Sequence, residues 1–113
     1  MKHWVWSTCW SPRSTYIMVG SVEGSLYLYR WTKEEVKLEW RKNIARDWIY
    51  SICFHPERID RIALGCRDCH VYFIDLDGNV LWRRKLDDWV YDVCFSPNGS
   101  YIAAVTLKGS ATF

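Results

Sequence analysis

The sequence predicts an all-β fold built from repeated units, and two observations carry that prediction. The first is a nine-residue phrase that occurs three times, at residues 4–12, 48–56 and 89–97, each time with Trp, Cys and Pro in the same order. The copies lie about 40–45 residues apart, a period typical of repeat architectures. The second is an aromatic content of 17%, with eight Trp and seven Tyr. Such side chains suit the half-buried surface of a sheet better than a helix.

In the first unit, three further strands are expected after the repeated phrase. Residues 16–20 form an apolar run of strand length, and residues 21–25 contain the Gly that a tight hairpin needs. Residues 26–29 follow as a third strand. Residues 36–40 alternate apolar and charged side chains, which is typical of a strand with one face in water. The first unit is therefore predicted to span about residues 4–44.

The second and third units repeat the same order. After the repeated phrase, strands are expected at residues 61–65, 71–74 and 80–84 in the second unit and at residues 101–105 in the third. The second unit spans about residues 48–86. The third unit, residues 89–113, is incomplete, because it reaches a third strand and lacks a fourth.

Four antiparallel strands per unit, with the innermost strand most apolar and the outermost most charged, are the layout of a β-propeller blade. The expected fold class is therefore all-β, with β-propeller blades of four antiparallel strands. Propellers have about 4–8 blades, whereas this chain supplies about two and three-quarters. The sequence thus predicts either a fragment of a larger propeller or a homo-oligomer, in which two or three copies close a ring by self-association.

Several segments resemble known propeller repeats. Residues 20–28 and 90–99 resemble WD-repeat sequences, and the turn at residues 78–82 is similar to the pyrroloquinoline-quinone-type repeats of prokaryotic proteins. The resemblance covers essentially the whole chain, and it implies a non-enzymatic propeller that acts as a protein-interaction scaffold. The family's polar bracing residues are replaced here, so the match is to a divergent branch: its Trp-Asp pair is Tyr29-Arg30 and Ile74-Asp75, and its His becomes Ala45 and Leu86.

The charge pattern favours neither nucleic acid nor a membrane as partner. The net charge is +2, and no basic run is longer than residues 83–85. The sequence contains neither an apolar stretch long enough to span a membrane nor an N-terminal signal region, so we expect a cytoplasmic protein. Cys9, Cys53 and Cys94 hold one equivalent position in the repeat. They are expected to be small buried core residues in a reducing compartment.

One segment matches a cofactor motif. Residues 66–70 read Cys-Arg-Asp-Cys-His, the C-x-x-C-H pattern of covalent haem attachment, and zinc could use Cys66, Cys69 and His70 with His55 or His3. Alignment of the repeats places this segment on the hairpins at residues 21–25 and 106–110. The favoured interpretation is therefore a hairpin with no cofactor and no metal. The alternatives are a metal- or haem-binding redox protein and a fragment of a propeller enzyme.

The best candidate site is a surface, and no catalytic residues are expected. In the propeller family, the loop entering the first strand and the hairpin between the second and third strands lie on one face. The resemblance thus implies a ring of aromatic and charged side chains around the central opening, a composition typical of binding hot spots. The alternative is that each Trp packs against the neighbouring blade. The ring, which would bind an unknown protein or peptide, comprises Trp4, Trp48, Trp89, Asp47, Asp88, Glu23, Arg67, Asp68 and Lys108.

Overall fold

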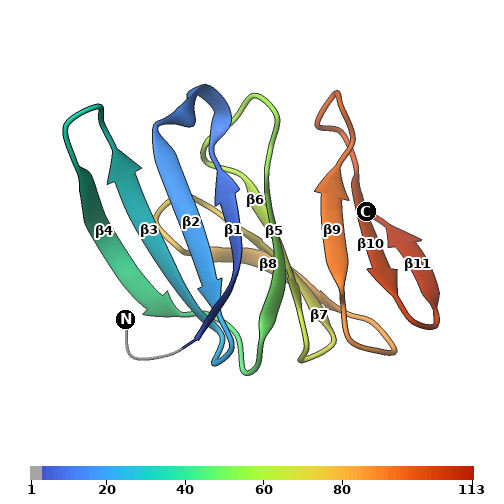
Figure 1. The fold of residues 1–113 in the computed structure, drawn as a ribbon. Helices are drawn as coiled ribbons and strands as arrows, with labels where there is room; N and C mark the ends of the chain where they lie inside the picture. Colours follow the sequence, from blue (N-terminus) through green and yellow to red (C-terminus); the bar gives the residue numbers. More distant parts are fainter. Residues whose placement is uncertain (1–3) are drawn as a thin grey trace.

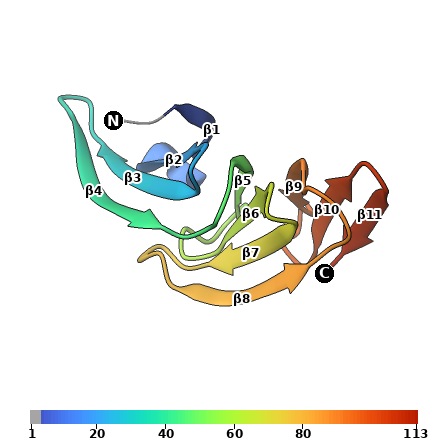
Figure 2. The same cartoon turned by 90° about the horizontal axis from the view of Figure 1, so that it is seen from below.

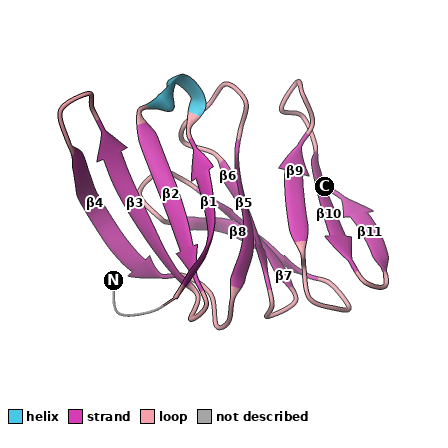
Figure 3. Ribbon diagram, viewed as in Figure 1, coloured by secondary structure: helices cyan, strands magenta, loops and turns pink. Residues whose placement is uncertain are grey.

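The computed structural model describes residues 4–113, which form β-strands and a single 3-10 turn (Figures 1 and 3). No described residue belongs to a helix that could cross a membrane. The first sheet contains β1 (Val5–Trp10), β2 (Tyr16–Ser21), β3 (Ser25–Trp31) and β4 (Val36–Asn43), with the turn η1 (Pro12–Ser14) between β1 and β2. The second contains β5 (Ile49–Phe54), β6 (Ile62–Cys66), β7 (His70–Ile74) and β8 (Val80–Lys85). The third contains β9 (Asp92–Phe95), β10 (Ile102–Thr106) and β11 (Gly109–Thr112).

The three sheets are arranged as consecutive blades of an arc. Within each sheet the strands pair antiparallel in chain order. Seen along the strands, β1, β5 and β9 lie on the inner side of the arc, and β4 and β8 lie on the outer side (Figure 2). The predicted fold class, all-β with four-stranded antiparallel blades, is thereby confirmed.

The innermost strand of the third sheet begins later than the repeat predicts. The repeated phrase predicts a strand from residue 89, whereas β9 begins at Asp92. In β1 and β5 the register shifts immediately after the first strand residue. At the matching place in the third sheet, the Val90 N–H instead donates to the Cys66 carbonyl of the second sheet at 3.0 Å. The next residue, Tyr91, still donates its N–H to the Val105 carbonyl of its own sheet at 2.9 Å, although β9 begins only at Asp92.

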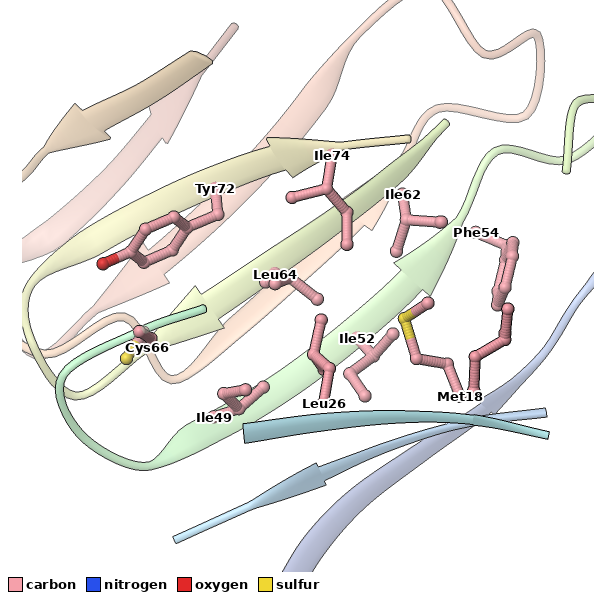
Figure 4. Packing of buried hydrophobic residues seen from close by; sticks show 12 residues of the cluster. Met18, Leu26, Ile49, Ile52, Phe54, Ile62, Leu64, Cys66, Tyr72 and Ile74 are labelled. Carbon is pink, nitrogen blue, oxygen red and sulfur yellow. The ribbon is translucent and has the colours of Figure 1, made fainter. Parts of the chain in front are cut away.

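Strand β6 is buried on both faces because the second sheet lies between the first and third sheets. Ile62 and Leu64 pack into a core shared with Met18 and other residues of the first sheet (Figure 4). Ala63, which points to the opposite face, joins a second core that includes Val93 and further residues of the third sheet. Strand β6 thus presents larger side chains to the first sheet and smaller ones to the third.

The three equivalent cysteines are buried to different degrees, which corrects the expectation that all three are core residues. Cys9 packs against the first core and Cys53 against the second, and both are half-buried. This partial burial raises the pKa of each thiol. Cys94 is exposed. It holds the same place in the pleat, but on a face against which no described sheet packs.

Candidate functional site

Five aromatic rings form a continuous row across the beginning of the innermost strands. The Trp6 ring centroid lies 5.1 Å from that of Trp48, and the Trp48 centroid lies 5.9 Å from that of Tyr50. Tyr50 stacks on Tyr91 with centroids 5.1 Å apart, and its centroid lies 6.3 Å from that of Trp89. We call Trp6, Trp48, Tyr50, Trp89 and Tyr91 the aromatic row. It crosses all three sheets.

Arg67 lies across the aromatic row and joins two blades. Its guanidinium carbon lies 4.1 Å from the Trp89 ring centroid and 5.3 Å from that of Trp48. Its Nε lies 3.8 Å from a carboxylate oxygen of Asp47. The hairpin between β6 and β7 holds this residue in place, because the Arg67 N–H donates to the Trp48 carbonyl at 2.8 Å. A guanidinium over two indole faces is a favourable cation–π arrangement.

The aspartates that precede Trp48 and Trp89 have the same local geometry. The Asp47 carboxylate accepts a hydrogen bond from the Trp48 N–H at 2.8 Å, and the Asp88 carboxylate accepts one from the Trp89 N–H at 2.7 Å. Each carboxylate thus satisfies the backbone N–H of the residue that follows it, in the loop that leads to an inner strand. Asp47 and Asp88 therefore make the same backbone contact next to a tryptophan of the row.

The structure brings together some of the predicted ring residues and separates others. The hairpins β2–β3, β6–β7 and β10–β11 lie at the same edge as the loops that enter β5 and β9 (lower edge of Figure 1). Within that edge, Trp4 is 80% exposed and Glu23 forms an ion pair with Arg41 at 3.0 Å. Lys108 lies beside Leu86 at a separate small cavity. Asp68 turns toward Tyr72 and His70. His3 lies outside the described residues.

Three members of the aromatic row were missed by the sequence analysis. Trp6, Tyr50 and Tyr91 follow the predicted tryptophan positions by two residues, so they share a face with them in an extended chain. The repeated phrase contains this signal as an aromatic residue at its third position. What the phrase does not encode is that rings of adjacent blades approach within stacking distance.

The C-x-x-C-H segment forms the β6–β7 hairpin. Cys66 is buried in the first core, and its thiol donates to the Asp47 carbonyl at 3.3 Å. Burial raises the pKa of this thiol far above its usual range, so the thiol stays protonated in the unliganded protein. Among residues 4–113, no three His, Cys, Asp or Glu side chains are grouped so that they could hold a metal ion. The segment thus forms the hairpin that the alignment of the repeats predicts, and its lack of a cofactor or metal stays a prediction.

Cys69 occupies a backbone position that favours glycine. Its φ is 72°, and the equivalent hairpin residues Gly24 and Gly109 have φ of 88° and 149°. We expect Cys69→Gly to stabilise the fold by up to about 1 kcal/mol, because glycine adopts a left-handed conformation without the penalty of a Cβ. Urea unfolding measures the change. The control Cys94→Gly, on the exposed strand β9, is expected to destabilise by about 0.5–1 kcal/mol. A loss of stability in Cys69→Gly would show that the thiol matters more than the backbone.

Comparisons with known proteins agree with this fold. The family model described as "WD domain, G-beta repeat" matches residues 1–30 and 83–111, just over half of the chain. The U3 small nucleolar RNA-associated protein 4 homolog of Mus musculus is 28% identical over 83 residues, which are 74% of this chain and 12% of the mouse protein. The similarity of residues 78–82 to pyrroloquinoline-quinone-type repeats stays a prediction.

A solved structure shares the arrangement of blades. The crystal structure of the Cps50 (Swd1) beta-propeller domain of Myceliophteria thermophila superposes with a TM-score of 0.83 and covers the whole chain at 15% sequence identity. At that identity the likeness shows the fold alone. The chain spans 39% of that structure's length and about an eighth of the mouse relative, so it corresponds to a minor part of each.

Proposed function

The chain belongs to the WD domain, G-beta repeat family, and from this premise we propose that it is a non-enzymatic protein-interaction module that binds a protein or peptide through the aromatic row and Arg67. Membership of this family and the propeller fold are consistent with an interaction module. The observation that carries the choice of surface is the Arg67 guanidinium lying over the rings of Trp48 and Trp89. Trp, Tyr and Arg are the residues in which binding energy concentrates at interfaces.

The exposure of the row supports a binding role. Trp6 is 57% exposed, while Trp48, Tyr50, Trp89 and Tyr91 are half-buried. Rings held by their neighbours lose little side-chain entropy when a partner covers them, which favours binding. All five cysteines are free thiols. The proposal therefore includes a reducing compartment, the cytoplasm, as the site of action.

A second element of the proposal is self-association into a closed ring. The third sheet exposes Tyr101, Val105 and Leu107, and the first sheet exposes Trp10. These apolar side chains, on the two end sheets, are ones that a head-to-tail contact would remove from water. We propose a head-to-tail contact between copies, and light scattering on a sizing column tests it. A discrete dimer or trimer that Val105→Lys dissociates supports the contact, and a monomer contradicts it.

The test of the binding surface compares two tryptophans. Trp48→Ala removes a ring of the row, whereas Trp31→Ala removes a ring that packs on Trp10, with centroids 5.8 Å apart, at the opposite edge of the first sheet. We expect both variants to lose about 1–2 kcal/mol of stability, because neither ring is fully buried. Only Trp48→Ala should weaken partner binding, by about 2 kcal/mol or more.

The measurement uses the full-length protein. Quantitative mass spectrometry identifies the proteins that copurify with it in stoichiometric amounts, and titration with the purified partner gives the affinities of the two variants. Equal affinities for Trp48→Ala and the unaltered protein would contradict the proposed surface. A loss of 3–5 kcal/mol of stability in Trp48→Ala would instead assign the row a packing role.

A further inference from the structure

A basic cavity lies on the second sheet, apart from the aromatic row. It has a volume of about 270 Å³ and is lined by Arg46, Asp68, His70, Tyr72, Arg83 and Lys85. Three of these residues are cations at neutral pH, and one is an acid. A cavity lined by several positive charges attracts an anion, because a bound anion offsets the electrostatic repulsion between the cations.

The sheet register explains why these side chains converge. His70 pairs with Lys85 and Tyr72 pairs with Arg83 across β7 and β8. Because successive residues of a strand alternate between faces, these two cross-strand pairs lie on the same face, the one that carries Tyr72 toward the first core. The remaining cation, Arg46, comes from the loop between β4 and β5. Four residues of the cavity are thus placed by regular strand pairing.

Asp68 connects several residues of the cavity through hydrogen bonds. Its carboxylate accepts hydrogen bonds from the Tyr72 hydroxyl, the Arg46 N–H at 3.3 Å and the His70 N–H at 3.1 Å. Its side chain is 8% exposed. Burial opposes ionisation, but these hydrogen bonds outweigh it and lower the pKa of Asp68. The acid is therefore ionised, and the cavity keeps a net positive charge because three cations face one carboxylate.

The cations of the cavity form no ion pair with another described residue. Within residues 4–113, the side chains of Arg46, Arg83 and Lys85 make no hydrogen bond, ion pair or ring contact with another described residue. By contrast, Arg84, between Arg83 and Lys85 on β8, has its guanidinium 5.7 Å from the Trp82 ring centroid on the other face. Two guanidinium groups and an ammonium group are the donors that match the oxygens of a phosphate group.

We propose that this cavity binds a phosphate monoester carried by a phosphorylated side chain of a partner protein. A phosphorylated side chain has a charge of about −1.5 to −2 and three acceptor oxygens in a small volume, which matches three cations gathered in one cavity. The neighbouring loops disfavour a nucleic-acid backbone, because Asp47, Asp87 and Asp88 flank Arg46 and Lys85 in sequence. Repulsion from these nearby carboxylates would oppose an extended polyanion more than a single phosphate group. This site is distinct from the aromatic row, so either proposal can fail alone.

The test uses two adjacent arginines of β8. The probe is a fluorescent peptide library with one fixed phosphoserine and randomised flanking residues. Its binding to the full-length protein is compared with the binding of the same library carrying serine in place of phosphoserine. Phosphorylated peptides are expected to bind, and Arg83→Gln is expected to weaken them about tenfold, the usual consequence of losing a charge-assisted hydrogen bond. Arg84→Gln, with the same change of charge on the opposite face, should bind as the unaltered protein does. Thermal unfolding followed by circular dichroism confirms that both variants are folded.

Three results would overturn the proposal. Equal binding of the phosphoserine and serine libraries would show that the cavity does not recognise the phosphate group. Equal losses in Arg83→Gln and Arg84→Gln would show a general effect of charge. Displacement of the phosphopeptides by a short single-stranded RNA, with the same loss in both arginine variants, would show a polyanion surface instead of a phosphate site.

Discussion

Leu64→Ala is expected to destabilise the protein by about 2–5 kcal/mol. Leu64 is fully buried at the centre of β6 and belongs to the core shared by the first and second sheets (Figure 4). Truncation removes contacts with both sheets at once. Because each sheet buries its faces only on its neighbours, the resulting cavity weakens the joint between blades as well as the sheet itself.

Leu81→Ala is the matched control for this core prediction. It makes the same chemical change on β8, where Leu81 is 45% exposed, and surface changes of this kind fall within about 0.5 kcal/mol. Denaturant unfolding followed by tryptophan fluorescence measures both variants. Similar losses for Leu64→Ala and Leu81→Ala would mean that the contact between the first two sheets contributes little to stability.

Gly24→Ala is expected to destabilise by about 3 kcal/mol or more. The residue has φ of 88°, and a Cβ built on it would lie 2.2 Å from the carbonyl oxygen of Ala45. That contact is with backbone, which cannot rotate away. Gly24 also accepts hydrogen bonds from the Ile44 and Ala45 N–H groups, both at 3.0 Å, so its own backbone is held in place. A left-handed penalty of about 1–2 kcal/mol therefore adds to an overpacking cost of about 1–3 kcal/mol.

Gly109→Ala separates these two contributions. Gly109 holds the equivalent hairpin position in the third sheet with φ of 149°, and nothing lies within 4 Å of a Cβ built there. We therefore expect the conformational penalty alone, about 1–2 kcal/mol. Thermal and urea unfolding report both variants. If Gly109→Ala cost as much as Gly24→Ala, the close approach of the Ala45 carbonyl would not be the cause.

The fold could be predicted from the sequence because the repeated phrase and the hairpin glycines act locally. The Trp-to-Pro phrase marks each innermost strand, and Gly24 and Gly109 mark hairpins whose φ is positive. The later start of β9 and the hydrogen bond from Val90 to Cys66 of another sheet could not be predicted. Local sequence patterns carry no information about that partner.

The candidate site was predicted less completely for the same reason. Trp48, Trp89 and Arg67 were identified from their positions in the repeat, and the structure places them in contact. Glu23 and Asp68 hold corresponding hairpin positions, yet Glu23 pairs with Arg41 and Asp68 with Tyr72. Side chains at equivalent positions of a repeat therefore diverge when each sheet offers a different neighbour.

The most direct test of the proposed binding surface is site-specific photo-crosslinking in the full-length protein. A photoreactive phenylalanine analogue replaces either Trp6 or Trp10, which lie near opposite ends of β1 and are similarly exposed at 57% and 50%. If the aromatic row is the contact surface, the bound partner will crosslink to position 6 and not to position 10. Crosslinks to the partner from position 10, with none from position 6, would contradict the account.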